Sequence, residues 1–256
     1  MRKVIRVLVL AVAATAFFAC NDDKSKTEVQ STENDMAVVE KETTETVEFL
    51  YVTAPSGLSL REHGNLNSEK LAVMPYGTKV KIVTPETKET MTVAGIKGGM
   101  HEVEFNHKTG YAFNGYLSKF FPPEEDIKPK VYAEELKAQF SKVEYSESNG
   151  GTASSPTNTS TLKLPTKSWH EAFFIATELY GIPKHFAFPE PKGSPEETVA
   201  DTKKPKDVTT SDLKVFRTND ALEKIEYDYQ AKGYSYIITI QQNDDSMVLE
   251  KTEKTE

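Results

Sequence analysis

The residues whose types and spacing could support chemistry are a single cysteine and a few histidines. Cys20 is the only cysteine in the 256-residue chain, and it lies far in the sequence from His63, His101 and His107. A cysteine nucleophile needs a histidine base beside it, and a zinc site needs several ligands at close spacing. The sequence shows neither pattern. Because His101 shares strand parity with Val103, we expect a partly buried, hydrogen-bonded histidine at that position.

Other catalytic signatures are also missing from the sequence. It contains no G-x-S-x-G, H-E-x-x-H, P-loop or dinucleotide-binding pattern. Its many acidic residues are typical of solvated faces, and their spacing does not place two carboxylates across one cleft. We therefore expect no catalytic residue, no metal site and no cofactor, and we predict a protein that is not an enzyme.

The N-terminal residues have the composition of a secretory leader. Arg2, Lys3 and Arg6 precede an uncharged run, residues 7–19, made almost entirely of Val, Leu, Ala and Phe. As a helix this run would reach about 20 Å, which is shorter than the hydrocarbon core of a bilayer. We predict a signal peptide over residues 1–19.

The junction between the leader and the rest of the chain offers two cleavage sites. Ala19 directly before Cys20 resembles the bacterial lipoprotein signal, in which the cysteine becomes the lipidated first residue of the mature chain. This resemblance implies that fatty acids such as palmitate on Cys20 hold the protein at a membrane. The alternative is cleavage by ordinary signal peptidase after Ala14-Thr15-Ala16, which would leave Cys20 as a free thiol.

Residues 20–46 have the composition of a disordered tether. Residues 21–46 contain eight acidic residues against three lysines and no aromatic residue, so they cannot bury enough apolar surface to offset chain entropy. Removing the three basic residues of the leader leaves 28 basic against 39 acidic residues, a formal charge of −11. Such a charge opposes binding to nucleic acid or to an anionic lipid surface.

Residues 47–121 have the pattern of a small β-barrel. Turn residues cut this segment into short apolar runs, in which buried positions alternate with polar ones: Leu58 and Leu60, Val80 and Ile82, and Val103 and Phe105. Short strands at this spacing favour a barrel that closes its own edges. We expect Gly57, Gly77 and Gly110 to be turn glycines with unusual backbone dihedrals.

Three stretches of this segment resemble the bacterial SH3-type (SH3b) domain: GLSLRE, LAVMPYGTKVKIV and HEVEFNHKTGYAFNGYL. They match its G-L-x-x-R, G-T-x-V and G-Y-x-x-x-x-Y-L elements in order, from Phe49 to about Phe121. The resemblance implies an SH3-like barrel that binds cell-wall peptide or another envelope ligand at one rim. Tyr76, Tyr111 and Tyr116 match aromatic positions and are the ligand-binding candidates. The alternative for each is a half-buried packing tyrosine.

Residues 122–161 are predicted to be a linker that contains one short helix. The helix is expected between Val131 and Lys142, with Leu136 and Phe140 on one side. The stretch SESNGGTASSPTNTST, residues 146–161, is low in complexity and rich in small polar residues, which is typical of a flexible linker. We place a domain boundary there.

Residues 162–252 are predicted to form a small α+β domain, followed by a tail over residues 253–256. Ser168 precedes Glu171 as a capping box, and Gly181 and Pro183 end the helix that follows. The helix carries one apolar stripe, which we expect to be core: Ala172, Phe173, Ala176, Leu179 and Tyr180. Strand patterns from 213 onward, with turns near 232 and 244, predict an antiparallel meander of four strands.

Together these features predict a mainly β protein in which an SH3-like barrel is followed by an α+β domain of one helix on a meander. We expect a lipid-anchored protein of the cell envelope, on the periplasmic side or at the outer membrane or cell surface. It would hold two non-catalytic binding modules, the first for peptidoglycan peptide or another envelope protein, with no nucleic acid as partner. The alternative is an envelope enzyme inhibitor or hydrolase whose active surface lies in residues 162–252.

Overall fold

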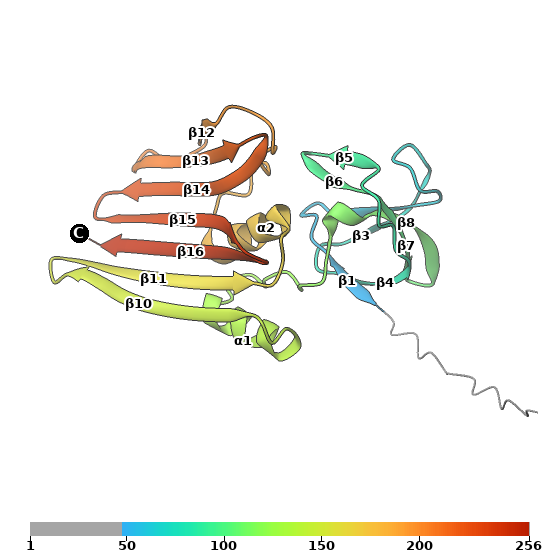
Figure 1. Cartoon of the computed structure of the whole chain (residues 1–256), viewed down its shortest axis with the longest axis horizontal. Helices are drawn as coiled ribbons and strands as arrows, with labels where there is room; N and C mark the ends of the chain where they lie inside the picture. The colour runs from blue at the N-terminus through green and yellow to red at the C-terminus, as the bar shows by residue number, and fades with distance from the viewer. Residues whose placement is uncertain (1–47, 256) are drawn as a thin grey trace, which may run out of the picture. The chain divides into compact units, whose positions relative to one another are not determined.

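The computed structural model describes residues 48–255, which belong to one compact unit, Glu45–Glu256. These residues are mainly β: two antiparallel seven-stranded sheets, one two-stranded hairpin and two α-helices (Figure 1). The predicted leader, Cys20 and the predicted tether lie outside the described residues. Neither of the two described α-helices is long and apolar enough to cross a membrane.

The first sheet has the strand order β3-β2-β8-β7-β4-β1-β9, and all of its pairings are antiparallel. The predicted alternation is confirmed, because Leu58, Leu60 and Val103 are buried in one core beneath the sheet. Its strands are β1 (Phe49–Val52), β2 (Leu58–Arg61), β3 (Lys70–Met74), β4 (Lys79–Thr84), β7 (Met100–Phe105), β8 (Lys108–Phe113) and β9 (Leu117–Ser118).

The prediction of a closed barrel is wrong. In the described structure the end strands β3 and β9 each pair on one side only, so the sheet stays open. Strand β9 is only two residues long, and the chain leaves the sheet immediately after it. Strand β2 meets β8 through a single residue pair, Arg61 with Tyr111. A two-residue end strand offers too few backbone hydrogen bonds to close the sheet into a barrel.

A short hairpin and one helical turn complete the first half of the described chain. Strands β5 (Met91–Val93) and β6 (Ile96–Gly98) are joined by Ala94 and Gly95, whose φ angles of 48° and 79° are both positive. Two such residues form the primed turn that matches the twist of a tight hairpin. The 3₁₀ turn η1 (Asn114–Tyr116) links β8 to β9. The sequence patterns did not predict this hairpin.

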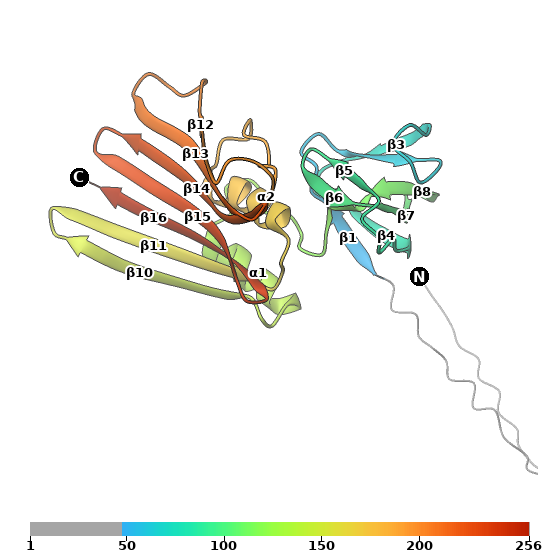
Figure 2. The same ribbon diagram turned by 45° about the horizontal axis from the view of Figure 1, so that its top comes forward.

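The second sheet has the order β10-β11-β16-β15-β14-β13-β12, also antiparallel throughout. The predicted meander is confirmed in β13 to β16, with three further strands beside it. Figure 2 shows β12 at one edge of this sheet. The strands are β10 (Glu144–Thr152), β11 (Ser155–Leu164), β12 (Glu196–Ala200), β13 (Val208–Thr218), β14 (Ala221–Ala231), β15 (Tyr234–Asn243) and β16 (Ser246–Thr255).

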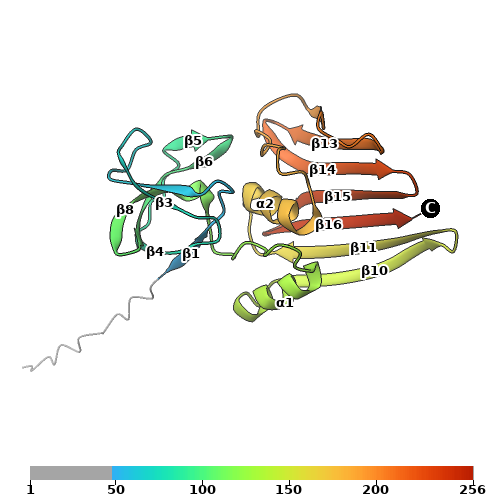
Figure 3. The same cartoon turned by 180° about the vertical axis from the view of Figure 1, so that it is seen from behind.

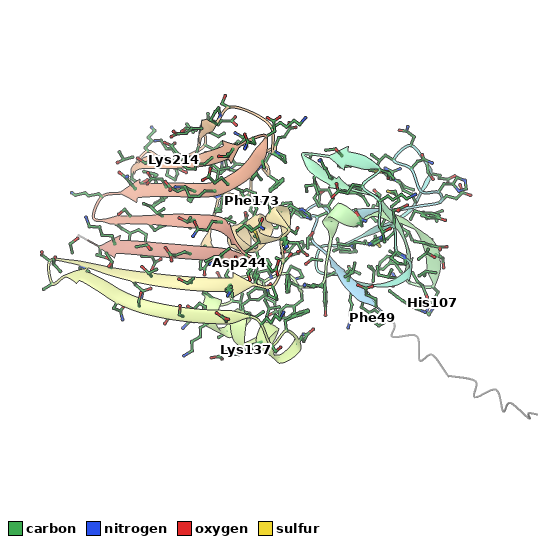
Figure 4. All side chains as sticks on the ribbon, viewed as in Figure 1. Phe49, His107, Lys137, Phe173, Lys214 and Asp244 are labelled. Carbon is green, nitrogen blue, oxygen red and sulfur yellow. The ribbon has the colours of Figure 1, made fainter. Side chains whose placement is uncertain are left out.

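Two helices lie on one face of this sheet, α1 (Pro129–Gln139) and α2 (Trp169–Tyr180) (Figure 3). The end signals of α2 are confirmed: the Ser168 hydroxyl accepts a hydrogen bond from the Glu171 N–H, and Gly181 has a left-handed φ of 85°. Phe173 of α2 packs in the core against the sheet (Figure 4). Helix α1 begins at a proline, which is favourable at the first helical position.

The predicted linker is wrong at residues 146–161, which lie in the hairpin of β10 and β11. Eight residues of β11 also pair with β16, so the backbone hydrogen bonds come from a strand distant in sequence. Helix α1 belongs to the same core as α2, because Tyr132 and Leu136 are buried there. The predicted tail is likewise wrong for residues 253–255, which extend β16. The second half therefore carries two helices on seven strands, and not one helix on four.

The glycine predictions are partly confirmed. Gly57 and Gly77 have positive φ angles of 83° and 76°, as turn glycines do. Gly110 lies inside β8 and has no positive φ, so its prediction as a turn glycine is wrong. A Cβ atom at Gly110 would lie 2.6 Å from the Arg61 carbonyl oxygen. The position needs glycine because two backbones approach closely there.

Candidate functional site

A pocket of about 330 Å³ has the strongest features of a binding site in the described structure. Its volume is within the range of small-ligand sites, and most of its wall is apolar. Arg61 is the only charged residue that lines it. The walls come from four parts of the chain: the 54–61 segment with Leu66; Val93 and Ala94; Met100, Phe113 and Tyr116; and Phe174 with residues 186–188.

Arg61 supplies the charge of this pocket. The register of β2 against β3 shifts between Leu60 and Arg61, and such a bulge re-aims the side chain that follows it. The guanidinium donates from Nη1 to the Ser68 carbonyl oxygen at 2.6 Å. No carboxylate in the described part of the chain pairs with Arg61. Because a guanidinium has five N–H donors, most of them remain available to a ligand.

The loop after β2 holds Arg61 in place. The Ser68 hydroxyl accepts a hydrogen bond from the His63 N–H at 2.8 Å, and the Glu62 N–H donates to the Glu69 carbonyl at 3.0 Å. These bonds close the 62–69 loop on itself, so the Ser68 carbonyl has a fixed position. The guanidinium is therefore oriented before any ligand arrives, which lowers the entropy cost of binding.

Aromatic side chains form part of the apolar wall of the pocket. The ring centroid of Tyr116 lies 6.0 Å from that of Phe174 and 5.9 Å from that of Phe113. Burial raises the pKa of Tyr116, which keeps its phenol neutral. Phe188 packs beside these rings, and its ring centroid lies 5.8 Å from that of Phe173. The pocket thus joins an apolar wall to one cationic group.

The three predicted ligand tyrosines do not gather at one site. Tyr116 lines the pocket described above. Tyr76 lies in the turn before β4 and lines a different hollow of about 760 Å³, together with Tyr51, Phe121 and four glutamates. Tyr111 lies on β8, opposite Arg61 in the sheet, and does not line the Arg61 pocket. Only Tyr116 of the three is therefore part of this candidate site.

The histidines of the first half do not form a metal site. Among residues 48–255 no group of three or more His, Cys, Asp or Glu side chains is arranged to hold a metal ion. His107 lies in the exposed turn between β7 and β8 (Figure 4). The prediction for His101 is confirmed: it is partly buried, and its Nδ1 accepts a hydrogen bond from the Glu86 N–H at 2.8 Å. Burial lowers its pKa, so it is neutral at pH 7.

A serine on β13, a histidine and an aspartate meet in one cluster, but not in the order of a catalytic triad. Asp201 accepts from His185 Nε2 at 2.8 Å through one oxygen and from the Ser211 hydroxyl at 2.9 Å through the other. A serine nucleophile needs the histidine beside it, whereas here the carboxylate stands between them. Ser211 also contacts the Tyr227 hydroxyl at 2.8 Å. The cluster fastens the 182–207 segment to the sheet.

Comparisons with known proteins add no relative. No family model, no curated protein and no solved structure matches this chain. The site is therefore interpreted from its own residues.

Most of this pocket was not predicted from the sequence. Arg61 ends the stretch GLSLR, which the sequence analysis used to recognise a domain and not to assign a site. The walls from residues 174 and 186–188 are more than a hundred residues away in the chain. The only sequence signal for these walls is the number of aromatic residues between positions 173 and 188.

Proposed function

We propose that this protein is a non-catalytic binding protein of the cell envelope, which takes the acidic end of a short peptide into the Arg61 pocket. The observation that carries the proposal is that Arg61 is the only charged group in a pocket whose wall is mostly apolar. An arginine fork binds a carboxylate through two parallel hydrogen bonds. An apolar wall beside it favours a small apolar side chain next to that carboxylate.

A cell-wall stem peptide fits this chemistry, because it ends in D-alanine with a free carboxylate. The resemblance of residues 49–121 to SH3b domains supports the same class of ligand, as does the proposed lipid anchor at Cys20. The pocket also takes part of its wall from α2 and the 186–188 segment. Both halves of the described chain therefore contribute to binding in this proposal.

Calorimetric titration of the full chain tests the proposal. A peptide ending in D-Ala-D-Ala should bind the unmutated protein, and its C-terminal amide should bind much more weakly. Arg61→Gln should weaken binding of the free acid about tenfold to a hundredfold, because a hydrogen bond to a charged group contributes about 1.5–3 kcal/mol.

Lys97→Gln is the matched control for this titration. Lys97 is an exposed cation on β6, close in sequence to the pocket residues of the β5–β6 turn but outside the lining. Its loss removes the same charge and should leave the affinity unchanged. Equal binding of the acid and the amide, or full affinity in Arg61→Gln, would contradict the proposal.

A further inference from the structure

The second sheet carries a group of tyrosines on the face that also bears the helices. Tyr229 of β14 lies directly opposite Tyr236 of β15, and Tyr236 lies opposite Glu253 of β16. Tyr234 and Lys251 complete the group through contacts with these residues. We call these five residues, Tyr229, Tyr234, Tyr236, Lys251 and Glu253, the tyrosine patch.

The helices leave this part of the sheet uncovered. Figure 3 shows α1 and α2 over one end of the strands, while the chain's C-terminal end lies at the other. The tyrosine patch belongs to that second end, beside the β14–β15 turn and the last residues of β16. Tyr234 is 36% exposed, and Tyr229 and Tyr236 are half-buried.

Contacts within the patch fix the rings. Tyr229 and Tyr236 are stacked with centroids 4.7 Å apart and planes 17° apart. The Lys251 ammonium lies 4.5 Å from the Tyr236 centroid. The Tyr234 hydroxyl donates to a Glu253 oxygen at 2.8 Å, which holds the exposed ring in one orientation. A ligand that packs on Tyr234 would therefore meet a preorganised surface.

The charges of the patch are already paired with each other. Lys251 Nζ lies 2.6 Å from a Glu253 carboxylate oxygen, so the patch offers neither a free cation nor a free anion. Burial alone would raise the pKa of Glu253, but hydrogen bonds from Lys251 and Tyr234 outweigh it and hold that pKa below its usual range. This arrangement suits an uncharged ligand. The chain's net charge of −8 also opposes nucleic acid, the other common partner of stacked aromatic rings.

Polar groups continue across the neighbouring strands. Asn158 of β11 lies opposite Glu253. Its side-chain Nδ2 donates a hydrogen bond to the side-chain Oδ1 of Asn149, on β10, at 2.9 Å. That bond leaves the side-chain NH₂ group of Asn149 and the side-chain oxygen of Asn158 for a further partner. The patch thus combines ring faces with uncharged donors and acceptors along one row of the sheet.

We propose that the tyrosine patch binds a neutral β-linked glycan. A pyranose ring has a flat face of C–H groups that packs on an aromatic ring, and hydroxyls at its rim that pair with amides and carboxylates. The fixed Tyr234 ring offers the aromatic face on which a sugar ring can pack. The Asn149 and Asn158 side chains offer the amides that can bind the sugar hydroxyls. This site is separate from the Arg61 pocket and does not depend on the function proposed for it.

Calorimetry of the full chain with chitohexaose and cellohexaose, both neutral β-linked hexasaccharides, tests the proposal. At least one of them should bind at millimolar glycan. Tyr234→Ala should weaken that binding about tenfold, the order expected for one aromatic contact, while Tyr234→Phe keeps the ring and most of the affinity. Arg61→Gln should bind the glycan as the unmutated chain does, which separates this site from the peptide site.

NMR of the unmutated chain with ring-labelled tyrosine covers the case in which Tyr234→Ala does not fold. The glycan should shift tyrosine signals of the patch and leave Tyr132, which is buried in the core, unchanged. The proposal is overturned if neither hexasaccharide binds, or if one binds and leaves the patch signals unmoved. Binding of a proline-rich peptide to the patch in place of either glycan also overturns it.

Discussion

At the scale of single residues, Arg61 and His170 show two opposite ways in which the fold treats an ionisable side chain. Arg61 is the only charged residue that lines its pocket, and no described carboxylate pairs with it. His170 shows the opposite case: burial lowers its pKa to about 4, so it is neutral in the folded state at pH 7. Its ring lies among Phe174 and Phe188, which also line the Arg61 pocket.

His170 should make the protein less stable in mild acid. In the unfolded chain its pKa is near 6.5, so between about pH 6.5 and pH 4 the unfolded state binds the extra proton and stability falls as the pH falls. Because the side chain is not fully buried, we expect a loss of about 1–2 kcal/mol on going from about pH 7.5 to about pH 5. Urea unfolding at the two pH values measures it.

His170→Gln isolates this contribution from those of other titrating groups. The variant should lose less stability than the unmutated chain over the same pH interval. His63→Gln, the same substitution at an exposed position, is the matched control variant. An identical pH dependence in the His170→Gln variant and the unmutated chain would disprove the assignment.

At the scale of elements, local sequence signals predicted α2 and the β13–β16 meander, because these are specified by neighbouring residues. Ser168 and Gly181 mark the two ends of α2 through contacts within a few residues. The β10–β11 hairpin was missed because its strands show no apolar alternation, and β10 is mostly exposed. Its order comes from pairing with β16, about ninety residues away, which no local pattern reveals.

Gly110 of β8 lies so close to the backbone of β2 that there is no room for a side chain. Gly110→Ala would place a methyl group against the Arg61 carbonyl, at 2.6 Å, and should destabilise the fold by about 1–3 kcal/mol. Urea unfolding measures the loss. The same change should weaken peptide binding, because it displaces the strand that carries Arg61.

Gly150→Ala is the matched control, also a glycine in a strand without a positive φ. Its new Cβ would meet only the Thr157 side-chain oxygen, at 3.1 Å, and no backbone atom. We expect a change within about 0.5 kcal/mol. Equal losses in the two variants would show that the close approach of β2 and β8 does not restrict position 110.

At the scale of the whole molecule, the candidate site could not be predicted because it is assembled from distant segments. The β2 segment, the β5–β6 turn and the 186–188 segment meet only in the folded chain. The sequence did predict the mainly β composition, and it named as a candidate the one tyrosine that lines the pocket, Tyr116. The lipid anchor proposed at Cys20 concerns a residue outside the described part of the chain and stays a prediction.

The anchor has a direct test. Cys20→Ala should abolish labelling by radioactive palmitate in growing bacteria and release the protein from the membrane fraction. The unmutated chain, processed in the same cells, is the control. Absence of label on the unmutated chain would favour cleavage after Ala16 and would remove the anchor from the account.

Methyl NMR on methionine-labelled protein tests the central claim, peptide binding at Arg61, most directly. Met100 lines the Arg61 pocket, whereas Met247 is buried in the core of the second sheet. A peptide ending in D-Ala-D-Ala should shift the Met100 methyl signal, leave that of Met247 in place, and have no effect on the Arg61→Gln variant. An unmoved Met100 signal at saturating peptide, or the same shift in Arg61→Gln, would contradict the claim.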